Sequence, residues 1–246
     1  MKKYIADIIL VSVLIFISFS CSASYNSVKR MQKMEEGVDN PTTKEELTAA
    51  IKKYDERAMD LVLTESQEGI WYKILGTRYL DEQMYGKALE AFQKAVLYYP
   101  SNANLYYYIG LCAGYMANSV LDYQANGELS IESEKQNYLS LSESAYLRAL
   151  SLNSSYYRAM YGIGVLYVFE LNKNEEAIPY LEKFLEIQSK DTNGMFVLAR
   201  AYYSTYQFQK AIDLYDKIIT LNPNKEKVTK AQANKKIVLD AQYANN

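Results

Sequence analysis

Few side chains in this chain of 246 residues have the types and spacing that covalent chemistry needs. It contains two cysteines, Cys21 and Cys112, and no histidine. Ser-His-Asp and Cys-His catalysis both require an imidazole base, and the usual zinc sites include imidazole ligands, so the composition argues against all three. Two cysteines also cannot form a disulfide framework. Cys112 lies in an apolar segment, where we expect a buried and unreactive thiol.

Adjacent carboxylates are the other candidates, because a pair of them can act as acid and base. They occur at Asp81 and Glu82 and at Glu175 and Glu176. Both pairs stand between apolar segments, so solvated turns and helix starts explain them better than glycosidase chemistry. The sequence has no glycine-rich phosphate loop, no cluster with metal-ligand spacing and a net charge of only −2. We expect no enzymatic activity, no cofactor, no metal site and no nucleic-acid partner.

Cys21 suggests a different chemistry, because it ends a segment that is typical of an export signal. Lys2 and Lys3 precede an apolar run at residues 8–17, and small residues follow before the chain becomes polar. The run is shorter than the ~20 residues needed to span a bilayer. The segment resembles the signal of bacterial lipoproteins, in which the cysteine after the cleavage site carries lipid.

The lipoprotein resemblance implies a signal peptide at residues 1–20 and a lipid-anchored, flexible tether at 21–41. Ser22 after the cysteine favours the outer membrane, so we expect a protein of the bacterial cell envelope that faces the periplasm. Two alternatives are plain secretion and an uncleaved membrane anchor. In a third, Cys21 is only a small residue in a discarded peptide.

The elements that would position any site are predicted to be helices from residue 42 onward. Thr43 and Glu46 have the spacing of a capping box. Apolar residues then recur at three- and four-residue steps, which places them on one face of a helix over 42–66. The members of this stripe are Leu47, Ala50, Ile51, Tyr54, Ala58 and Leu61. We expect this helix to be an N-terminal cap.

Residues 69–102 contain two helical patterns separated by a turn, in which we expect Gly86. Small residues stand where two helices must approach closely, and large ones fill the gaps. The spaced set is Tyr72, Leu75, Gly76, Tyr79, Tyr85, Ala88, Phe92, Ala95 and Pro100. It resembles the tetratricopeptide repeat, whose pattern is W-x2-L-G-x2-Y, then A-x3-F, then P, in about 34 residues.

The same register recurs along the chain, so the resemblance covers residues 69–225. The repeats are 69–102, 103–156 with an insertion at 117–136, 157–191 and 192–225. The resemblance implies an all-α superhelix of four helix-turn-helix repeats, with a second capping helix at 226–246. The lysines of residues 224–246, which are Lys225, Lys227, Lys230, Lys235 and Lys236, are expected to form a solvated face, with a partner or membrane contact as the alternative.

The insertion at 117–136 lengthens both helices of the second repeat. We expect helices of about 22 residues, each ~33 Å long, that extend beyond their neighbours. A contact surface that makes the protein a homo-oligomer is one interpretation. A tolerated surface insertion is the other, because loops lengthen at little energetic cost.

In stacked helix pairs the first helix of each pair lines the concave face. The residues expected to face that groove are Lys73, Thr77, Tyr107, Leu111, Tyr115, Arg158, Tyr161, Val165, Phe169, Phe196, Arg200 and Tyr203. Tyr and Arg often contribute most of the energy of binding. The alternative is that several of these tyrosines only pack between repeats. Thr77 and Tyr108 stand where repeats that hold a terminal carboxylate have asparagines, so we do not expect that activity.

Together these patterns predict a membrane-tethered scaffold for protein–protein interaction. A peptide or a partner helix would bind in the groove, in a process of bacterial cell-envelope assembly. One alternative is an accessory subunit that docks to a periplasmic solute-binding or transport protein. Another is a homo-oligomer formed through the inserted hairpin. An enzyme of envelope metabolism would need a catalytic constellation that the sequence does not contain.

Overall fold

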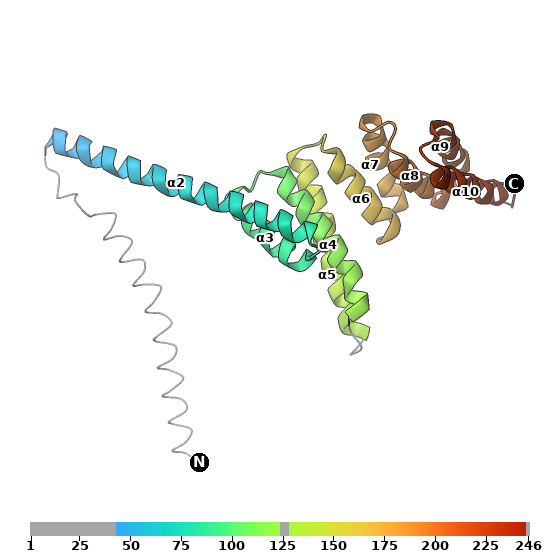
Figure 1. The fold of residues 1–246 in the computed structure, drawn as a ribbon, viewed down its shortest axis with the longest axis horizontal. Helices are drawn as coiled ribbons and strands as arrows, with labels where there is room; N and C mark the ends of the chain where they lie inside the picture. The colour runs from blue at the N-terminus through green and yellow to red at the C-terminus, as the bar shows by residue number, and fades with distance from the viewer. Residues whose placement is uncertain (1–42, 124–127, 245–246) are drawn as a thin grey trace, which may run out of the picture. The chain divides into compact units, whose positions relative to one another are not determined.

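The computed structural model describes residues 43–123 and 128–244, with the side chains of 120–123 and 128–131 left out. Every regular element in these two ranges is an α-helix (Figure 1). The all-α prediction is therefore confirmed. The predicted signal peptide, Cys21 and the tether lie outside the described residues. None of the described helices combines the length and the apolar character that crossing a bilayer requires.

Two compact units divide the chain between Glu65 and Ser66. The described part of the first unit is the beginning of helix α2 (Lys44–Asp81), which continues into the second unit. Its start is capped reciprocally: the Thr43 amide donates to Glu46 Oε2 at 3.1 Å, and the Glu46 amide donates to Thr43 Oγ1 at 3.2 Å. The predicted capping box is thus confirmed, and it satisfies two amides that lack helical partners.

α2 differs from the prediction because it does not break near residue 66. The sequence predicts a cap that ends there and a separate repeat helix from residue 69, yet α2 is continuous through both. No proline stands at the junction, and Gly69 weakens a helix by only about 1 kcal/mol relative to alanine. On the predicted stripe, Leu47, Ile51 and Leu61 are exposed.

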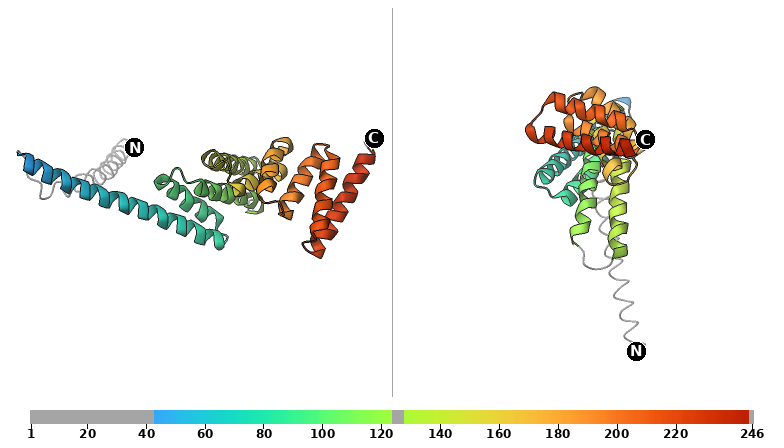
Figure 2. Two further views of the ribbon diagram at one scale, coloured as in Figure 1. Left: turned by 90° about the horizontal axis from the view of Figure 1, so that it is seen from above. Right: turned by 90° about the vertical axis from the view of Figure 1, so that its right-hand side faces the viewer.

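The second unit is a series of helices joined by short turns. After the C-terminal part of α2 come α3 (Tyr85–Tyr98), α4 (Ala103–Tyr123), α5 (Glu128–Leu152), α6 (Tyr157–Phe169), α7 (Asn174–Ile187), α8 (Thr192–Ser204), α9 (Phe208–Leu221) and α10 (Lys225–Ala244). From α3 onward each helix packs against the next, and α4 also contacts α6, as α6 contacts α8 (Figure 2). The first helices of repeats two to four therefore form one layer.

Close approach within each helix pair depends on a small residue facing a large one. A Cβ atom on Gly76 would lie 2.8 Å from the Phe92 ring, and one on Gly164 would lie 2.5 Å from Leu181. Real Cβ contacts are essentially never so short. The glycines let the two backbones approach, as the sequence predicts for Gly76.

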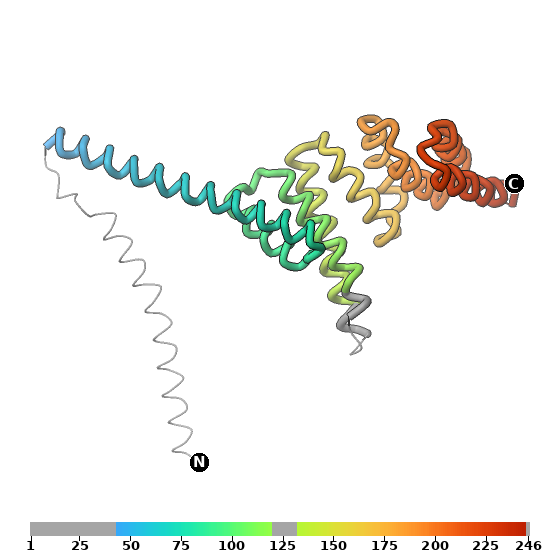
Figure 3. Tube along the Cα trace, in the orientation of Figure 1, coloured from blue at the N-terminus to red at the C-terminus, as the bar shows by residue number. Residues whose placement is uncertain are grey.

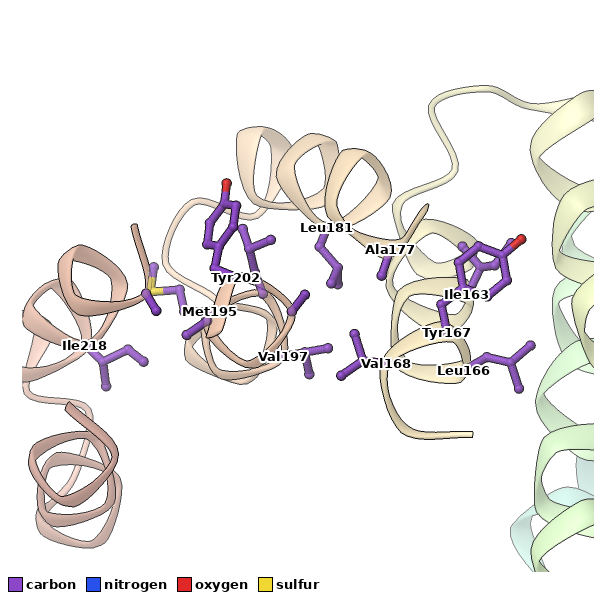
Figure 4. Packing of buried hydrophobic residues seen from close by; sticks show 14 of the residues in the cluster. Ile163, Leu166, Tyr167, Val168, Ala177, Leu181, Met195, Val197, Tyr202 and Ile218 are labelled. Carbon is purple, nitrogen blue, oxygen red and sulfur yellow. The ribbon is translucent and has the colours of Figure 1, made fainter. Parts of the chain in front are cut away.

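Buried side chains form a core that continues from one repeat to the next. In Figure 4, Val168 of α6 and Val197 of α8 point toward one another, and Leu181 of α7 points down from its helix onto the same layer. Ile163 and Leu181 have no exposed surface. Burying each such side chain contributes roughly 1.5–3 kcal/mol.

Cys112 belongs to a smaller core cluster around α3 and α4 and is completely buried. Burial raises the pKa of its thiol to about 12. The thiol is therefore protonated at neutral pH and inaccessible, as predicted from the sequence.

Three of the turns inside helix pairs each contain one residue with a left-handed backbone conformation. Gln83, Asn172 and Tyr206 have φ angles of 60°, 52° and 59°. The sequence prediction for the first turn is wrong in this detail, because Gly86 lies inside α3 and Gln83 makes the turn. The left-handed region is unfavourable for a side chain, so packing on both sides of the turn has to hold these residues there.

The second repeat departs from the others in length. α4 has 21 residues and α5 has 25, whereas α6 and α7 have 13 and 14. The two long helices run side by side and extend beyond the neighbouring pair (Figures 1 and 3). The predicted long helices are confirmed. Their role as a contact surface stays a prediction.

Candidate functional site

Ten of the twelve side chains predicted to face the groove line one of two hollows in the second unit. The α4–α6 hollow has a volume of about 330 Å³ and includes Tyr107, Leu111, Tyr115, Arg158, Tyr161 and Val165. The α8–α10 hollow has a similar volume, also about 330 Å³, and includes Phe169, Phe196, Arg200 and Tyr203. The repeat register therefore brings predicted residues from successive first helices together, but in two places.

Each hollow also contains residues that the sequence analysis did not select. The α4–α6 hollow is completed by Gly114, Asn118, Ser142, Tyr146, Gly162, Leu166 and Glu170. The α8–α10 hollow is completed by Val197, Tyr215, Lys230, Asn234, Ile237 and Val238.

Lys73 and Thr77 line neither hollow, although both are half-buried. The Thr77 hydroxyl donates to the Lys73 carbonyl of its own helix at 3.0 Å. The structure thus separates these two residues from the other ten, and their assignment to a binding groove stays a prediction.

Tyr146 of α5 is the innermost aromatic side chain of the α4–α6 hollow and is only 4% exposed. Two glycines make room for its ring: a Cβ atom would lie 2.9 Å from it on Gly110 and 2.6 Å from it on Gly162. Ser142, one turn earlier on α5, donates from its hydroxyl to the Gly110 carbonyl at 2.7 Å. These contacts hold α5 close behind α4 and α6.

Tyr107 lies beside Tyr146 and is half-buried. Its ring lies 6.2 Å from that of Tyr146 and 5.6 Å from that of Tyr156. Burial, and then the neighbouring Tyr156 phenol, raise the pKa of Tyr107 to about 12. The phenol is therefore neutral at physiological pH and keeps its proton to donate to a ligand.

Tyr115 also lines the hollow and is 43% exposed. Its ring stacks on that of Tyr85 with centroids 4.3 Å apart and planes 15° from parallel. An exposed ring that is already fixed by stacking loses little conformational entropy when a ligand covers it. Tyr161 combines both roles, because it lines the hollow and also lies 5.1 Å from the Phe184 ring.

The charged residues of the α4–α6 hollow have opposite signs and lie at opposite ends of α6. Arg158 is in the first turn of α6 and exposed, and a hydrogen bond with Tyr157 raises its pKa. Glu170 directly follows the last residue of α6, and Lys135 Nζ lies 3.6 Å from it. No ion pair in the described part of the chain involves Arg158. The hollow therefore offers one unpaired cation and one paired carboxylate.

Both charges of the α8–α10 hollow are positive. Arg200 Cζ lies 5.3 Å from the centre of the Phe169 ring, and Lys230 Nζ lies 5.7 Å from that of Phe196. These are cation–π distances, so each charge is held over an aromatic face. Tyr215 closes the hollow from below and is 4% exposed. Burial raises the pKa of Tyr215, while a hydrogen bond with Asn234 lowers it.

The α10 residues of this hollow were not among the predicted site residues, because 226–246 was expected to be a capping helix whose lysines form a solvated face. Lys230, Asn234, Ile237 and Val238 recur at four- and three-residue steps and so share one helix face. This spacing is the sequence signal from which their shared face can be predicted. Two other lysines also depart from the predicted solvated face: Lys235 pairs with Asp216 at 2.6 Å, and Lys227 donates to Thr192 Oγ1 at 2.9 Å.

Among residues 43–123 and 128–244 no group of three or more His, Cys, Asp or Glu side chains is placed to hold a metal ion. The side chains that line the two hollows can stack on aromatic rings, form hydrogen bonds and pair with an anion.

Comparison with known proteins supports the repeat assignment. The tetratricopeptide repeat matches residues 75–113, 157–191 and 194–225. A "TPR repeat-containing protein" from Borreliella burgdorferi is 25% identical over 189 residues, which cover 76% of this chain and 78% of that protein. These three segments therefore match the repeat that the sequence pattern resembles.

Solved structures show the same fold. YrrB, described as a TPR protein with an unusual peptide-binding site, has a TM-score of 0.52 and 19% identity, over 85% of this chain and 88% of that chain. MamA from Desulfovibrio magneticus, residues 41 to the end, has a TM-score of 0.51 and 14% identity, over 73% and 97%. The described helices thus form a tetratricopeptide solenoid.

Proposed function

We propose that this protein is an interaction scaffold that binds a peptide or a partner helix across the first helices of its repeats. The α4–α6 hollow is the observation that carries this proposal. Six side chains that the repeat register predicts to share a face come together there around a cavity of about 330 Å³. A peptide-binding site in YrrB, which has a similar fold, supports the same use of the solenoid.

The residue types of the hollow suit a peptide better than a small metabolite. Tyrosine rings contribute apolar area together with a hydroxyl, and aromatic pairs are worth about 0.5–1.5 kcal/mol beyond burial. Leu111 and Val165 add aliphatic surface between the rings. Arg158 can form a bidentate bond to a carboxylate, and the neutral phenol of Tyr107 can donate to a peptide carbonyl.

Peptide selection on the full chain tests this function. A displayed library of random 12-residue peptides would be selected on the protein, and the affinity of the best peptide would be measured by fluorescence anisotropy. We expect Tyr115→Ala and Arg158→Gln each to weaken that affinity about 5- to 20-fold, because Tyr and Arg are enriched among the interface residues whose truncation costs more than about 1 kcal/mol. The matched control is Tyr243→Ala, since Tyr243 is 79% exposed and lines neither hollow.

Both variants should melt within a few degrees of the wild type, because Tyr115 and Arg158 are exposed. A library that yields no binding peptide would contradict the proposal. So would peptides whose affinity falls equally for Tyr243→Ala and Tyr115→Ala.

We further propose that a lipid on Cys21 holds this scaffold at the bacterial outer membrane. The support is the sequence pattern of residues 1–22, a positive start, a short apolar run and small residues around a cysteine. Labelled palmitate should be incorporated into the wild type and into Cys112→Ala but not into Cys21→Ala. Membrane fractionation should then find Cys21→Ala in the soluble or unprocessed fraction. Equal labelling of the two cysteine variants would refute lipidation.

A further inference from the structure

We infer that the α8–α10 hollow is a specificity site for an Asp or Glu side chain that stands next to an apolar residue in the bound peptide. The inference rests on the proposed function, since the peptide is the same one, and it adds the chemical class that this part of the surface selects. The site also differs in location from the α4–α6 hollow, because α10 completes it and lies outside the repeats.

The apolar part of the hollow is open to solvent at its rim and closed at its base. Phe169 and Ile237 are 51% and 56% exposed, and they come from α6 and α10. Tyr215 and Val238 beneath them are almost completely buried. Large apolar side chains from different helices that meet around a hollow are typical of an interaction surface. An aliphatic or aromatic side chain of a ligand would complete this cluster.

The charged part has two cations and no carboxylate among its lining residues. Within the described ranges, the recorded ion pairs use Lys135, Lys173 and Lys235, and none of them uses Arg200 or Lys230. Asp216 follows the buried Tyr215 in sequence, but Lys235 already pairs with it at 2.6 Å. Two unpaired positive charges that line the same hollow favour an anion, because their attractions to it add.

The α4–α6 hollow lacks this preference although its volume is the same. Glu170 lines it, so a ligand carboxylate near that end would meet a like charge. An acidic peptide residue should therefore be directed to the α8–α10 hollow.

An internal side chain fits better than the end of a peptide. The exposed rim residues Phe169 and Ile237 come from different helices, so an extended segment can lie over both and continue beyond each. The inner hydroxyl, that of Tyr215, belongs to a side chain that is only 4% exposed. Arg200 and Lys230 are left as the two groups that can hold a carboxylate between α8 and α10.

The test uses peptides selected from a random 12-residue displayed library on the full chain. We expect the selected peptides to contain Asp or Glu beside Phe, Leu, Ile or Met. Replacing that acid by Asn or Gln should weaken binding at least tenfold, and so should the double variant Arg200→Gln with Lys230→Gln. In the double variant the change of acid to amide should have no further effect. Amidation of the peptide C-terminus should leave the affinity within twofold.

The matched control is Lys236→Gln, because Lys236 is exposed on the same helix and lines neither hollow. Arg200 and Lys230 are exposed, so an unchanged melting curve is expected for the double variant. Selected peptides without acidic residues would overturn the inference. So would a peptide that loses affinity on amidation, since it would bind through its terminal carboxylate.

The two proposals fail in different ways. If peptides are selected and depend on Tyr115 and Arg158 but not on Arg200 and Lys230, the acid-specific site is refuted while the scaffold function stands. If no peptide is selected, both are refuted.

Discussion

The two hollows have the same volume and a similar aromatic character, but their charges differ. The α4–α6 hollow has one cation and one carboxylate, Arg158 and Glu170. The α8–α10 hollow has two cations, Arg200 and Lys230, and no carboxylate. Both are built on the same register of first helices. The difference comes from two residues: Glu170, which directly follows α6, lines the first hollow, and Lys230 of the capping helix α10 lines the second.

This contrast distinguishes the positions that the repeat pattern specifies, which pack the helices, from the positions that it does not specify, which carry the charges. Glycine opposite a bulky side chain lets the helices of a pair approach closely. The residue that follows α6 and one face of α10 decide which charges enter them. Binding specificity in such a solenoid therefore depends on side chains that the repeat pattern does not specify.

Removing the floor of either hollow should have the largest effect. Tyr146→Ala and Tyr215→Ala each delete a ring that is only 4% exposed. We expect each to lower the free energy of unfolding by about 3–5 kcal/mol, as other buried aromatic truncations do. Urea denaturation followed by circular dichroism measures this loss. A loss below about 1 kcal/mol for either variant would mean that its ring is not needed to hold the hollow.

The conservative replacements sharpen the comparison. Tyr146→Phe keeps the ring between Gly110 and Gly162, so we expect the stability and the peptide affinity of the wild type. Tyr215→Phe removes the partner of Asn234 and should cost about 0.5–1.5 kcal/mol, the usual contribution of one hydrogen bond. If the Tyr146 hydroxyl stabilised the fold, Tyr146→Phe would instead lose more stability than Tyr215→Phe.

Removing the carboxylate of the first hollow should make it resemble the second. Glu170→Gln leaves Arg158 as the only charge lining the α4–α6 hollow. We expect a peptide with a second acidic residue at that hollow to bind about 2- to 5-fold more tightly at low salt, because a like charge has been removed. The gain in affinity should fall at high salt, which screens the effect. Isothermal titration at 50 and 500 mM NaCl measures this. The matched control is Glu175→Gln, an exposed carboxylate on α7 outside both hollows. An equal gain in that control would contradict the local origin of the effect.

The smallest effect is expected from alkaline titration of Tyr107. Burial raises its folded-state pKa from 10.0 to about 12, so the folded state favours the neutral phenol. The stability from this group is fully present below pH 10 and is lost as the pH rises from about 10 to 12. Tyr107→Phe should reduce the fall in melting temperature over that interval and leave stability near pH 7 almost unchanged. An identical pH profile in the variant would show that Tyr107 is not desolvated.

Helical periodicity predicted most of the fold and ten of the residues that line the hollows. The reason is that Gly110, Gly164 and the residues at matching positions fix the rotation of each first helix, so side chains at set distances from them share a face. Lys73 and Thr77 follow the same rule, yet they lie away from both hollows.

The remaining features depend on contacts that no local pattern encodes. Lys230 and Lys236 look alike in sequence, and only packing against α8 and α9 places the first over Phe196 and leaves the second outside the hollow. Gln83 adopts a left-handed conformation without being glycine, because its turn is held on both sides. α2 is continuous through residues 66–69 because no strong helix breaker stands there. The predicted repeat boundary at residue 69 led us to expect a break.

The central claim is that peptides bind on the face formed by the first helices. The most direct measurement replaces Tyr115, and separately Tyr243, by the photoreactive amino acid p-benzoylphenylalanine. Each variant of the full chain is irradiated with the selected peptide, and the adducts are mapped by mass spectrometry. Our account predicts an adduct at residue 115 and none at residue 243. An adduct at 243 without one at 115 would contradict it.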